Sequence, residues 1–394
     1  MPTLRGWGAL GAALALGALW IGFGERLLLG VALFLFFSVV LGSIYVRRGV
    51  PRVSARRTIT PAQVHDGDRA VVEIELISAS RVHQVVVSDT VHKLGSARFV
   101  ARRLFPDTPM VARYEVLSRP RGVYQVGPAS VVVRDPLAMA EAGRPVGRVD
   151  RLVVYPAVED LRGLPMVRGQ DPTVNTARSS FSPTGGDDFF TLREYQRGDD
   201  LRHVHWPSSA KRDNLMIKQL EMPWQSRGLV LLNPRAESYV SAESFEHAVR
   251  GAASALRHLF RAGFNPTLWL GQSDPTTLSS QQAYGVAMEA LAVASTRELV
   301  SLPAMIKRLT RGGIAGGAFV LVTGEADAQD VEAYRLLSSD YAKSVVMTVA
   351  RNETESIIQL KRVGAIAVQA GPGAAWAPAW REAMESAWST ATAG

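Results

Sequence analysis

One stretch of the chain concentrates the side chains that could do chemistry. It runs from Asp187 to Trp206 and combines carboxylates, guanidinium groups, two histidines and aromatic rings. Gly198 permits a sharp turn, and Asp199 or Asp200 could then accept hydrogen bonds from the backbone amides that follow. Planar arginine side chains match such carboxylates bidentately. The stretch therefore predicts a buried ion-pair cluster that ties two domains together, or else a binding surface for a partner protein.

An enzyme is the alternative reading of the same stretch. Asp199, Arg202, His205 and Trp206 could form the site of a hydrolase. His203 and His205 would share one face of an extended segment near Asp199, so a metal pair is conceivable there. Zinc sites use three or four protein ligands, however, and two histidines without an ordered third ligand are more often structural.

Other catalytic patterns are incomplete. Ser208 and Lys211 have the Ser-x-x-Lys spacing of penicillin-recognising enzymes, but the Ser-Asp-Asn and Lys-Thr-Gly tripeptides that such a site also needs do not occur. The phosphate-binding pattern Gly-x-x-x-x-Gly-Lys-Ser/Thr does not occur either. The glycines in residues 312–317 precede a predicted strand, whereas a dinucleotide fingerprint follows one. The sequence thus predicts neither a catalytic residue nor a cofactor.

Composition narrows the class of protein. The chain has 394 residues, 47% hydrophobic and 20% charged, and contains no cysteine, which excludes a disulfide scaffold, an iron–sulfur cluster and a cysteine nucleophile. Its net charge of +8 suits a nucleic-acid binder or a protein at an anionic membrane surface. The densest arginine cluster adjoins an apolar segment, so we expect a lipid bilayer rather than nucleic acid as the partner.

Residues 1–48 read as a transmembrane helical hairpin. No charged residue occurs from Trp7 to Gly24 or from Leu27 to Val46, and each run is about long enough to cross a hydrocarbon core of roughly 30 Å. Only Glu25 and Arg26 separate the runs. A cleaved signal peptide is the alternative, because Arg5 precedes an apolar stretch with small residues.

The arginines after the second apolar run predict the orientation. Because positive charge stays on the cytoplasmic side, we expect a two-pass protein of the cell membrane with both termini and the soluble body in the cytoplasm. The arginines are Arg47, Arg48, Arg52, Arg56 and Arg57.

The pattern of apolar residues differs between three segments of the soluble part. In residues 49–160, short runs of alternating apolar and polar residues are separated by turn-forming residues; Val72, Ile74 and Leu76, with glutamates between them, are one such run. This pattern predicts a small antiparallel β-sandwich. Residues 161–227 read as a linker that carries the polar stretch. Residues 228–394 alternate buried strands with helices, Ser241 being a plausible N-cap, which predicts an α/β domain with a parallel sheet and helices on both faces.

The chain resembles a known family, domain-of-unknown-function family 58. The resemblance rests on a motif in residues 193–211 with the Leu215–Glu221 strand, on the upstream runs 121–124, 127–128 and 134–137, and on the two-helix N-terminus. The hallmark residues are Tyr195, Gly198, Asp199, Asp200, Arg202, Trp206, Ala210 and Lys211.

This resemblance implies a bacterial membrane protein that is often encoded beside MoxR-type AAA+ ATPases and has a C-terminal domain like von Willebrand factor A. In that fold a metal site follows the first strand as Asp-x-Ser-x-Ser. The aligned residues here are Asn233, Arg235 and Glu237, and the third-strand loop offers only Glu325. Since a hard cation needs several oxygen ligands, we expect a degenerate site without metal. The expected function is a membrane-anchored adaptor for such an ATPase in the assembly or remodelling of a client.

Overall fold

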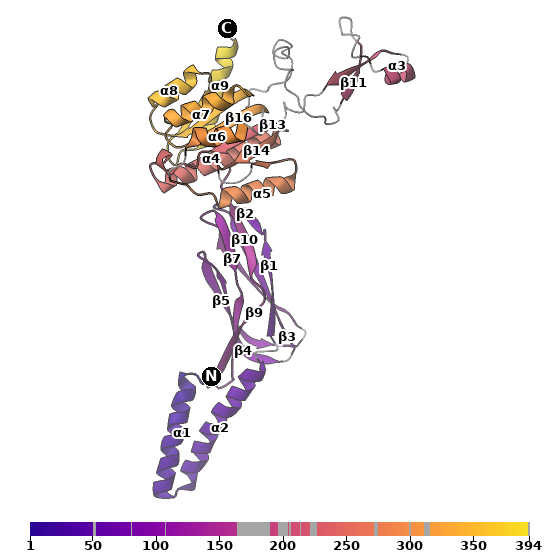
Figure 1. Cartoon of the computed structure of the whole chain (residues 1–394). Helices are drawn as coiled ribbons and strands as arrows, with labels where there is room; N and C mark the ends of the chain where they lie inside the picture. The colour runs from indigo at the N-terminus through magenta and orange to yellow at the C-terminus, as the bar shows by residue number, and fades with distance from the viewer. Residues whose placement is uncertain are drawn as a thin grey trace. The chain divides into compact units, whose positions relative to one another are not determined.

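The computed structural model describes residues 1–49, 53–79, 81–106, 108–163, 190–195, 204, 206–212, 214–220, 227–271, 275–298, 301–310 and 316–392 (Figure 1). The chain divides into two compact units. One comprises residues 1–157 with 288–293, and the other comprises residues 158–287 with 294–394.

The first unit begins with two antiparallel helices, α1 (Leu4–Phe23) and α2 (Arg26–Gly49). Both are long and apolar enough to cross a membrane. In the most apolar 18-residue segment of each helix, only 11% of the residues of α1 and 17% of those of α2 are buried. Side chains such as Leu14 and Phe34 are exposed. A core helix of a soluble protein would hide such side chains, so these helices are candidate membrane spans.

The start of α1 is fastened to the strand part of the unit. Thr3 caps the helix, its amide donates to the Met139 carbonyl at 2.9 Å, and its hydroxyl donates to the Ala138 carbonyl at 2.7 Å. Gly6 lies against the same turn, where a Cβ atom would stand 2.0 Å from the Met139 oxygen. The turn itself is held by Asp135, whose carboxylate accepts from the Leu137 and Ala140 amides.

The end of α2 is fastened to the same part of the unit. Val46 is fully buried in the core formed by the strands. The Tyr45 hydroxyl lies 3.2 Å from His83 Nδ1 and accepts from the His83 amide. Gly42 packs against Asp135, the residue that shapes the turn holding α1. One turn therefore positions both helices.

Gly6 gives a direct test of this attachment. In Gly6→Ala the new methyl group must push the Met139 carbonyl away, whereas in the matched control Gly8→Ala it meets open space. We expect Gly6→Ala to speed amide hydrogen exchange in residues 138–141 by about tenfold or more, because forcing an extra methyl group into a packed contact costs about 1–3 kcal/mol and makes local opening easier. Gly8→Ala should leave that exchange unchanged, and equal rates in both variants would contradict the docking.

Two sheets complete the first unit. The smaller has the order β1-β3-β6, from β1 (Val53–Thr60), β3 (Arg69–Ser78) and β6 (Met110–Leu117), and is antiparallel. The larger has the order β2-β10-β7-β4-β8-β9, with β5 pairing to β4. Its strands are β2 (Gln63–His65), β4 (Val82–Val91), β5 (Gly95–Leu104), β7 (Gly122–Val126), β8 (Ala129–Arg134), β9 (Glu141–Val146) and β10 (Asp150–Tyr155).

Buried residues of both sheets form one apolar cluster. Val72, Ile74 and Leu76 belong to it and are fully buried, which confirms the alternation predicted for that strand. A buried ion pair accompanies the cluster, because the Arg57 guanidinium binds Asp89 and Asp150 at 2.5 and 2.9 Å. Tyr114 donates a further hydrogen bond to Asp89 at 2.7 Å. Strands of both sheets thus share one charged network.

The second unit contains a six-stranded sheet with the order β15-β14-β13-β16-β17-β18. Its strands are β13 (Arg227–Leu232), β14 (Asn265–Trp269), β15 (Thr276–Thr277), β16 (Gly316–Thr323), β17 (Tyr341–Val349) and β18 (Ile366–Ala370). All neighbours are parallel except β14 and β15. The predicted parallel sheet is confirmed, and the strand order reverses between β13 and β16.

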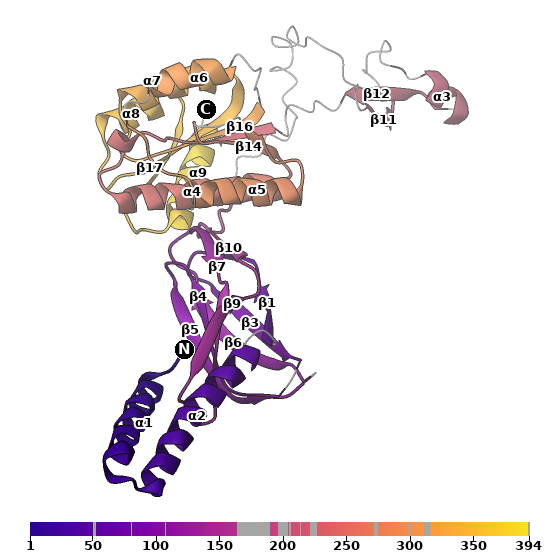
Figure 2. The ribbon, with the colours of Figure 1, turned by 60° about the horizontal axis from the view of Figure 1, so that its bottom comes forward.

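Helices cover both faces of this sheet (Figure 2). Helices α6 (Leu302–Thr310), α7 (Ala328–Ser338) and α8 (Glu355–Arg362) supply side chains to one core cluster. On the opposite face lie α4 (Ala242–Arg261), α5 (Gln281–Ala292) and α9 (Trp376–Thr392). The Trp376 indole donates to the His247 carbonyl at 3.0 Å, which joins α9 to α4.

Candidate functional site

The structure describes some residues of the hallmark motif. Strand β11 (Phe190–Glu194) pairs antiparallel with β12 (Met216–Leu220), and the Tyr195 amide donates to the Leu215 carbonyl at 2.8 Å. Helix α3 (Trp206–Arg212) lies between them in sequence and carries Ala210 and Lys211, both exposed, while Trp206 is 68% exposed. The Ser209 hydroxyl accepts from the Met216 amide, so α3 is tied to β12. The other hallmark residues and candidate enzyme residues lie outside the described residues: Gly198, Asp199, Asp200, Arg202, His203 and His205.

A second candidate site lies where the strand order of the six-stranded sheet reverses. In open α/β sheets, ligands bind outside the carboxyl ends of the strands at this point. Here Asn233 follows β13 directly and Thr323 ends β16, and the two strands run side by side in register. The parallel sheet therefore brings together residues that are 90 positions apart in the sequence.

Asn233 is fully buried at the centre of this site. Its side-chain amino group lies 3.0 Å from oxygen atoms of Ser238, Thr323 and Asp330, and so shares its hydrogens among three acceptors. Its side-chain oxygen accepts from the Arg235 amide at 3.0 Å. Asn233 thereby fixes the loop after β13 against β16 and α7.

Arg235 supplies the positive charge of the site. It is 1% exposed, and its guanidinium forms a two-pronged ion pair with Asp327 and donates to the Ser238 hydroxyl at 3.0 Å. Burial by itself would lower the pKa of Arg235, but the bond to Asp327 and the charge of Asp330 raise it. The guanidinium is therefore a permanent buried cation.

Asp330 supplies a fully buried carboxyl group that accepts from the Asn233 side chain. It accepts from the Asp327 amide at 3.0 Å and from the Thr323 hydroxyl at 3.3 Å. Burial raises the pKa of Asp330 to about 7, although the hydrogen bond from the Asp327 amide opposes this shift. Asp327 and Asp330 also form the capping box that begins α7.

A close backbone contact locks the two loops of the site together. The Glu325 amide donates to the Ser238 carbonyl at 2.8 Å. At Gly324 a Cβ atom would stand 1.8 Å from that same oxygen, so this position has room only for glycine. The buried network is thereby held rigidly beneath exposed side chains of the same loops, namely Glu237, Val240 and Glu325.

The predicted metal-site residues occupy different places. Asn233 and Arg235 lie inside the network, whereas Glu237 and Glu325 are exposed. Within the part of the chain that the structure describes, no group of three or more His, Asp or Glu residues could hold a metal ion. The chemistry of this donor set is that of a charge-balanced network, in which the guanidinium itself binds the Asp327 carboxylate and the Ser238 hydroxyl.

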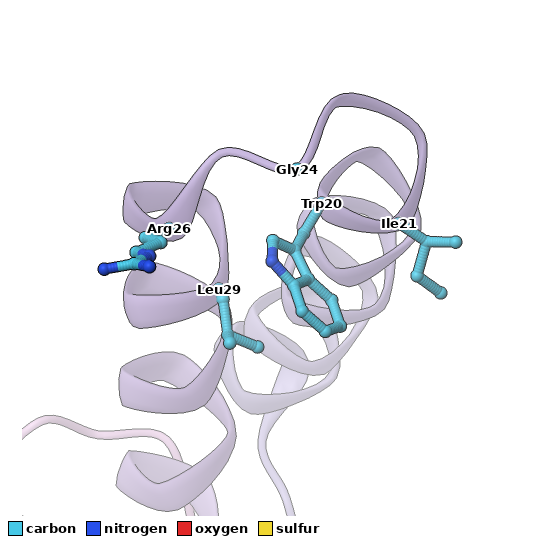
Figure 3. A pocket seen from close by; sticks show the side chains of 5 residues that line it. All are labelled: Trp20, Ile21, Gly24, Arg26 and Leu29. Atoms are coloured by element: carbon cyan, nitrogen blue, oxygen red, sulfur yellow. The ribbon is translucent and has the colours of Figure 1, made fainter.

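A pocket lies at the tip of the helical hairpin. Its lining residues are Trp20, Ile21, Gly24, Arg26 and Leu29. Trp20 points across the gap between the helices toward Leu29, while Arg26 points away from it (Figure 3). A tryptophan and an arginine beside apolar side chains at a helix end are typical of the membrane–water interface, and this lining offers no acid–base pair.

Comparison with known sequences gives two matches. Residues 191–296 match the family described as protein of unknown function DUF58. An uncharacterised protein, YeaD of Bacillus subtilis (strain 168), is 27% identical over 246 residues, an alignment that spans 59% of this chain and 60% of that protein.

Two solved structures share weak similarity. The CARDB domain of the PF1109 protein from Pyrococcus furiosus, crystallised with di-metal ions, is 15% identical and covers 27% of this chain and 94% of its own, with a TM-score of 0.21. The alkylpurine DNA glycosylase AlkC of Pseudomonas fluorescens is also 15% identical and covers 31% of this chain and 38% of its own, with a TM-score of 0.17. TM-scores of this size do not indicate a shared fold. The two sequence matches, by contrast, support the DUF58 family.

Proposed function

We propose that this chain is a membrane-anchored interaction protein that presents its C-terminal α/β unit to a MoxR-type AAA+ ATPase, or to a client of that ATPase. The partner class comes from the family resemblance. The interaction role rests on the way in which the anchor and the switch-point site are built.

The attachment of the helices supports the anchor. A signal peptide is removed from the mature protein and needs no contact with it, but here Thr3 and Gly6 pack on the turn shaped by Asp135. Val46, at the end of α2, is part of the core. The arginines Arg47 and Arg48 in the last turn of α2 favour a cytoplasmic soluble body.

The finer fold follows from the sheets. The sheet order β15-β14-β13-β16-β17-β18 corresponds to 3-2-1-4-5-6 in chain order, and we infer a domain like von Willebrand factor A from this order together with the loop after β13. The two sheets of the first unit share one core and are interpreted as a β-sandwich.

A single observation carries the proposed role. At the position where open α/β sheets bind ligands, this chain places side chains that are nearly all buried and bonded to one another. The site is filled by its own arginine, so what it offers to solvent is part of Asp327 and a rim of exposed Glu237, Val240 and Glu325. A rigid rim around a buried network suits recognition of a protein surface.

Capture of the ATPase tests this proposal. Full-length protein in lipid nanodiscs is immobilised and offered a purified MoxR-type ATPase from the same cell with ATP and Mg²⁺. We expect the wild type to retain the ATPase and to change its ATP turnover. Glu237→Lys combined with Glu325→Lys should lower capture by about tenfold or more, because it reverses the charge of the rim that the partner would recognise.

The matched control reverses two charges elsewhere in the same unit, Glu382→Lys with Glu385→Lys, at exposed positions of α9. It should capture the ATPase as the wild type does. No capture by the wild type, or equal loss in both double variants, would refute the proposed interaction surface.

A further inference from the structure

Six exposed arginines gather at the end of the first unit from which the helical hairpin emerges. We call them the arginine collar, and within the described chain none of them has an ion-pair or hydrogen-bond partner for its side chain. They are Arg5, Arg47, Arg48, Arg81, Arg102 and Arg103.

The fold, not the sequence order, brings them together. Arg5 lies in the first turn of α1, and Arg47 and Arg48 lie in the last turn of α2, so the antiparallel hairpin puts them at one end (Figure 1). The Tyr45 side chain binds His83, and His83 pairs with Arg103 in the β4–β5 ladder. Arg102 directly precedes Arg103 in β5.

Arg81 reaches the same end from the start of β4. Its guanidinium lies 5.3 Å from the centre of the Phe105 ring, and Phe105 follows the last residue of β5. Stacking on an aromatic face keeps a guanidinium extended without neutralising its charge. The collar thus combines three arginines from the helices with three from the start of β4 and the end of β5.

Several exposed arginines elsewhere in the first unit form ion pairs. Arg69, Arg113 and Arg119 are equally exposed, but each pairs with a carboxylate, at 2.7, 2.5 and 3.4 Å. Two carboxyl groups beside the hairpin are already engaged: Asp135 binds backbone amides, and Glu141 pairs with Arg134. Among the described residues, therefore, no carboxylate neutralises the collar.

We propose that the arginine collar binds the phosphate groups of anionic lipids in the leaflet where the hairpin leaves the membrane. Exposed apolar side chains of α1 and α2 adjoin the collar, so the bilayer that receives them brings its headgroups to the level of these arginines. Guanidinium groups bind phosphate oxygens bidentately. The collar holds the strand part of the unit against the membrane and enriches anionic lipid around the anchor.

This inference rests on the proposed membrane anchor, and the test separates the two. Full-length protein is reconstituted into nanodiscs of phosphatidylcholine with about 30% phosphatidylglycerol, and electron paramagnetic resonance of spin-labelled lipids measures the preference of each lipid for the protein surface. Failure to enter nanodiscs at all would refute the anchor. Entry with no preference for phosphatidylglycerol over phosphatidylcholine would refute the collar alone.

Two matched triple variants sharpen the result. In Arg81→Gln/Arg102→Gln/Arg103→Gln the preference for phosphatidylglycerol should fall about fivefold or more, since each arginine near an anionic surface adds to the attraction for anionic lipid. Arg69→Gln/Arg113→Gln/Arg119→Gln removes the same charge from paired positions and should keep the preference. Raising the salt concentration should weaken the wild-type preference. Equal behaviour of the two variants, or a wild-type preference unaffected by salt, would overturn the proposal.

Discussion

Arg235→Met should lower the free energy of unfolding of the α/β unit by about 3 kcal/mol, the lower end of the range for breaking a buried ion pair, because Asp327 is partly open to solvent. Methionine fills a similar volume but cannot bind Asp327 or the Ser238 hydroxyl. Native-state hydrogen exchange of the β13 and β16 peptides in the full-length protein measures the loss. Arg261→Met, at an exposed position of α4, should change stability by no more than about 0.5 kcal/mol.

The loss should also depend on pH in a defined direction. The pKa of Asp330 is raised by burial to about 7, and the Arg235 charge works against that rise. Below about pH 6 Asp330 is protonated with or without the arginine, so Arg235→Met lowers the free energy of unfolding by less. At pH 8 the wild type holds an ionised Asp330 that the arginine stabilises, so Arg235→Met lowers the free energy of unfolding by more. A loss that is independent of pH would show that Asp330 and Arg235 are not coupled.

Arg57→Met should destabilise the first unit by about 3–5 kcal/mol. The change leaves Asp89, which is fully buried, without its cation, and it also frees Asp150. Because the network spans both sheets, exchange should become faster in peptides from β4 and β6 together. Thermal unfolding of the full-length protein in detergent measures the loss of stability. Hydrogen exchange of the native protein, read in these peptides, shows where the loss occurs.

The neighbouring residue provides the control. Arg56 is exposed on the opposite side of the same strand, so Arg56→Met removes the same charge without touching the network. We expect it to change stability by no more than about 0.5 kcal/mol. If the two variants were equally stable, the Arg57 network would not hold the sheets together.

The sequence predicts elements well where a regular pattern repeats. The alternation of Val72, Ile74 and Leu76 predicted a strand with one buried face, and the Ser241 N-cap begins α4 as predicted, with its hydroxyl accepting from the Ser244 amide. Helix α8 (Glu355–Arg362) was not predicted, because eight residues are only about two turns and its apolar positions are few. Strand β15 was not predicted either, since a strand of two residues leaves no period to detect.

The candidate site could be predicted only in part. The resemblance pointed to Asn233 and Arg235, and both lie at the switch point of the sheet. The two partners at the start of α7, the N-cap Asp327 and Asp330, were not predicted, since they are distant in sequence and contact Asn233 and Arg235 only once the parallel sheet forms. Their Asp-x-x-Asp spacing before an apolar run is a capping signal, and it could have located the start of α7 without revealing the pairing.

The arginine collar and the Arg57 network could not be predicted from the sequence for the same reason. Arg56 and Arg57 are adjacent and were read alike as juxtamembrane charge, but strand alternation sends one to solvent and the other into a buried ion pair. Arg102 and Arg103 join the arginines of α2 through the pairing of β4 with β5, which no local pattern records.

A Mn²⁺ titration of the full-length protein, followed by electron paramagnetic resonance, tests most directly whether the chain's own arginine takes the place of a metal ion at the switch point. We expect the wild type and Asp327→Asn to bind Mn²⁺ equally weakly, because the buried guanidinium of Arg235 already balances the carboxyl groups there. Saturable binding of a single Mn²⁺ by the wild type that disappears in Asp327→Asn would contradict this account and would place a metal ion at the site.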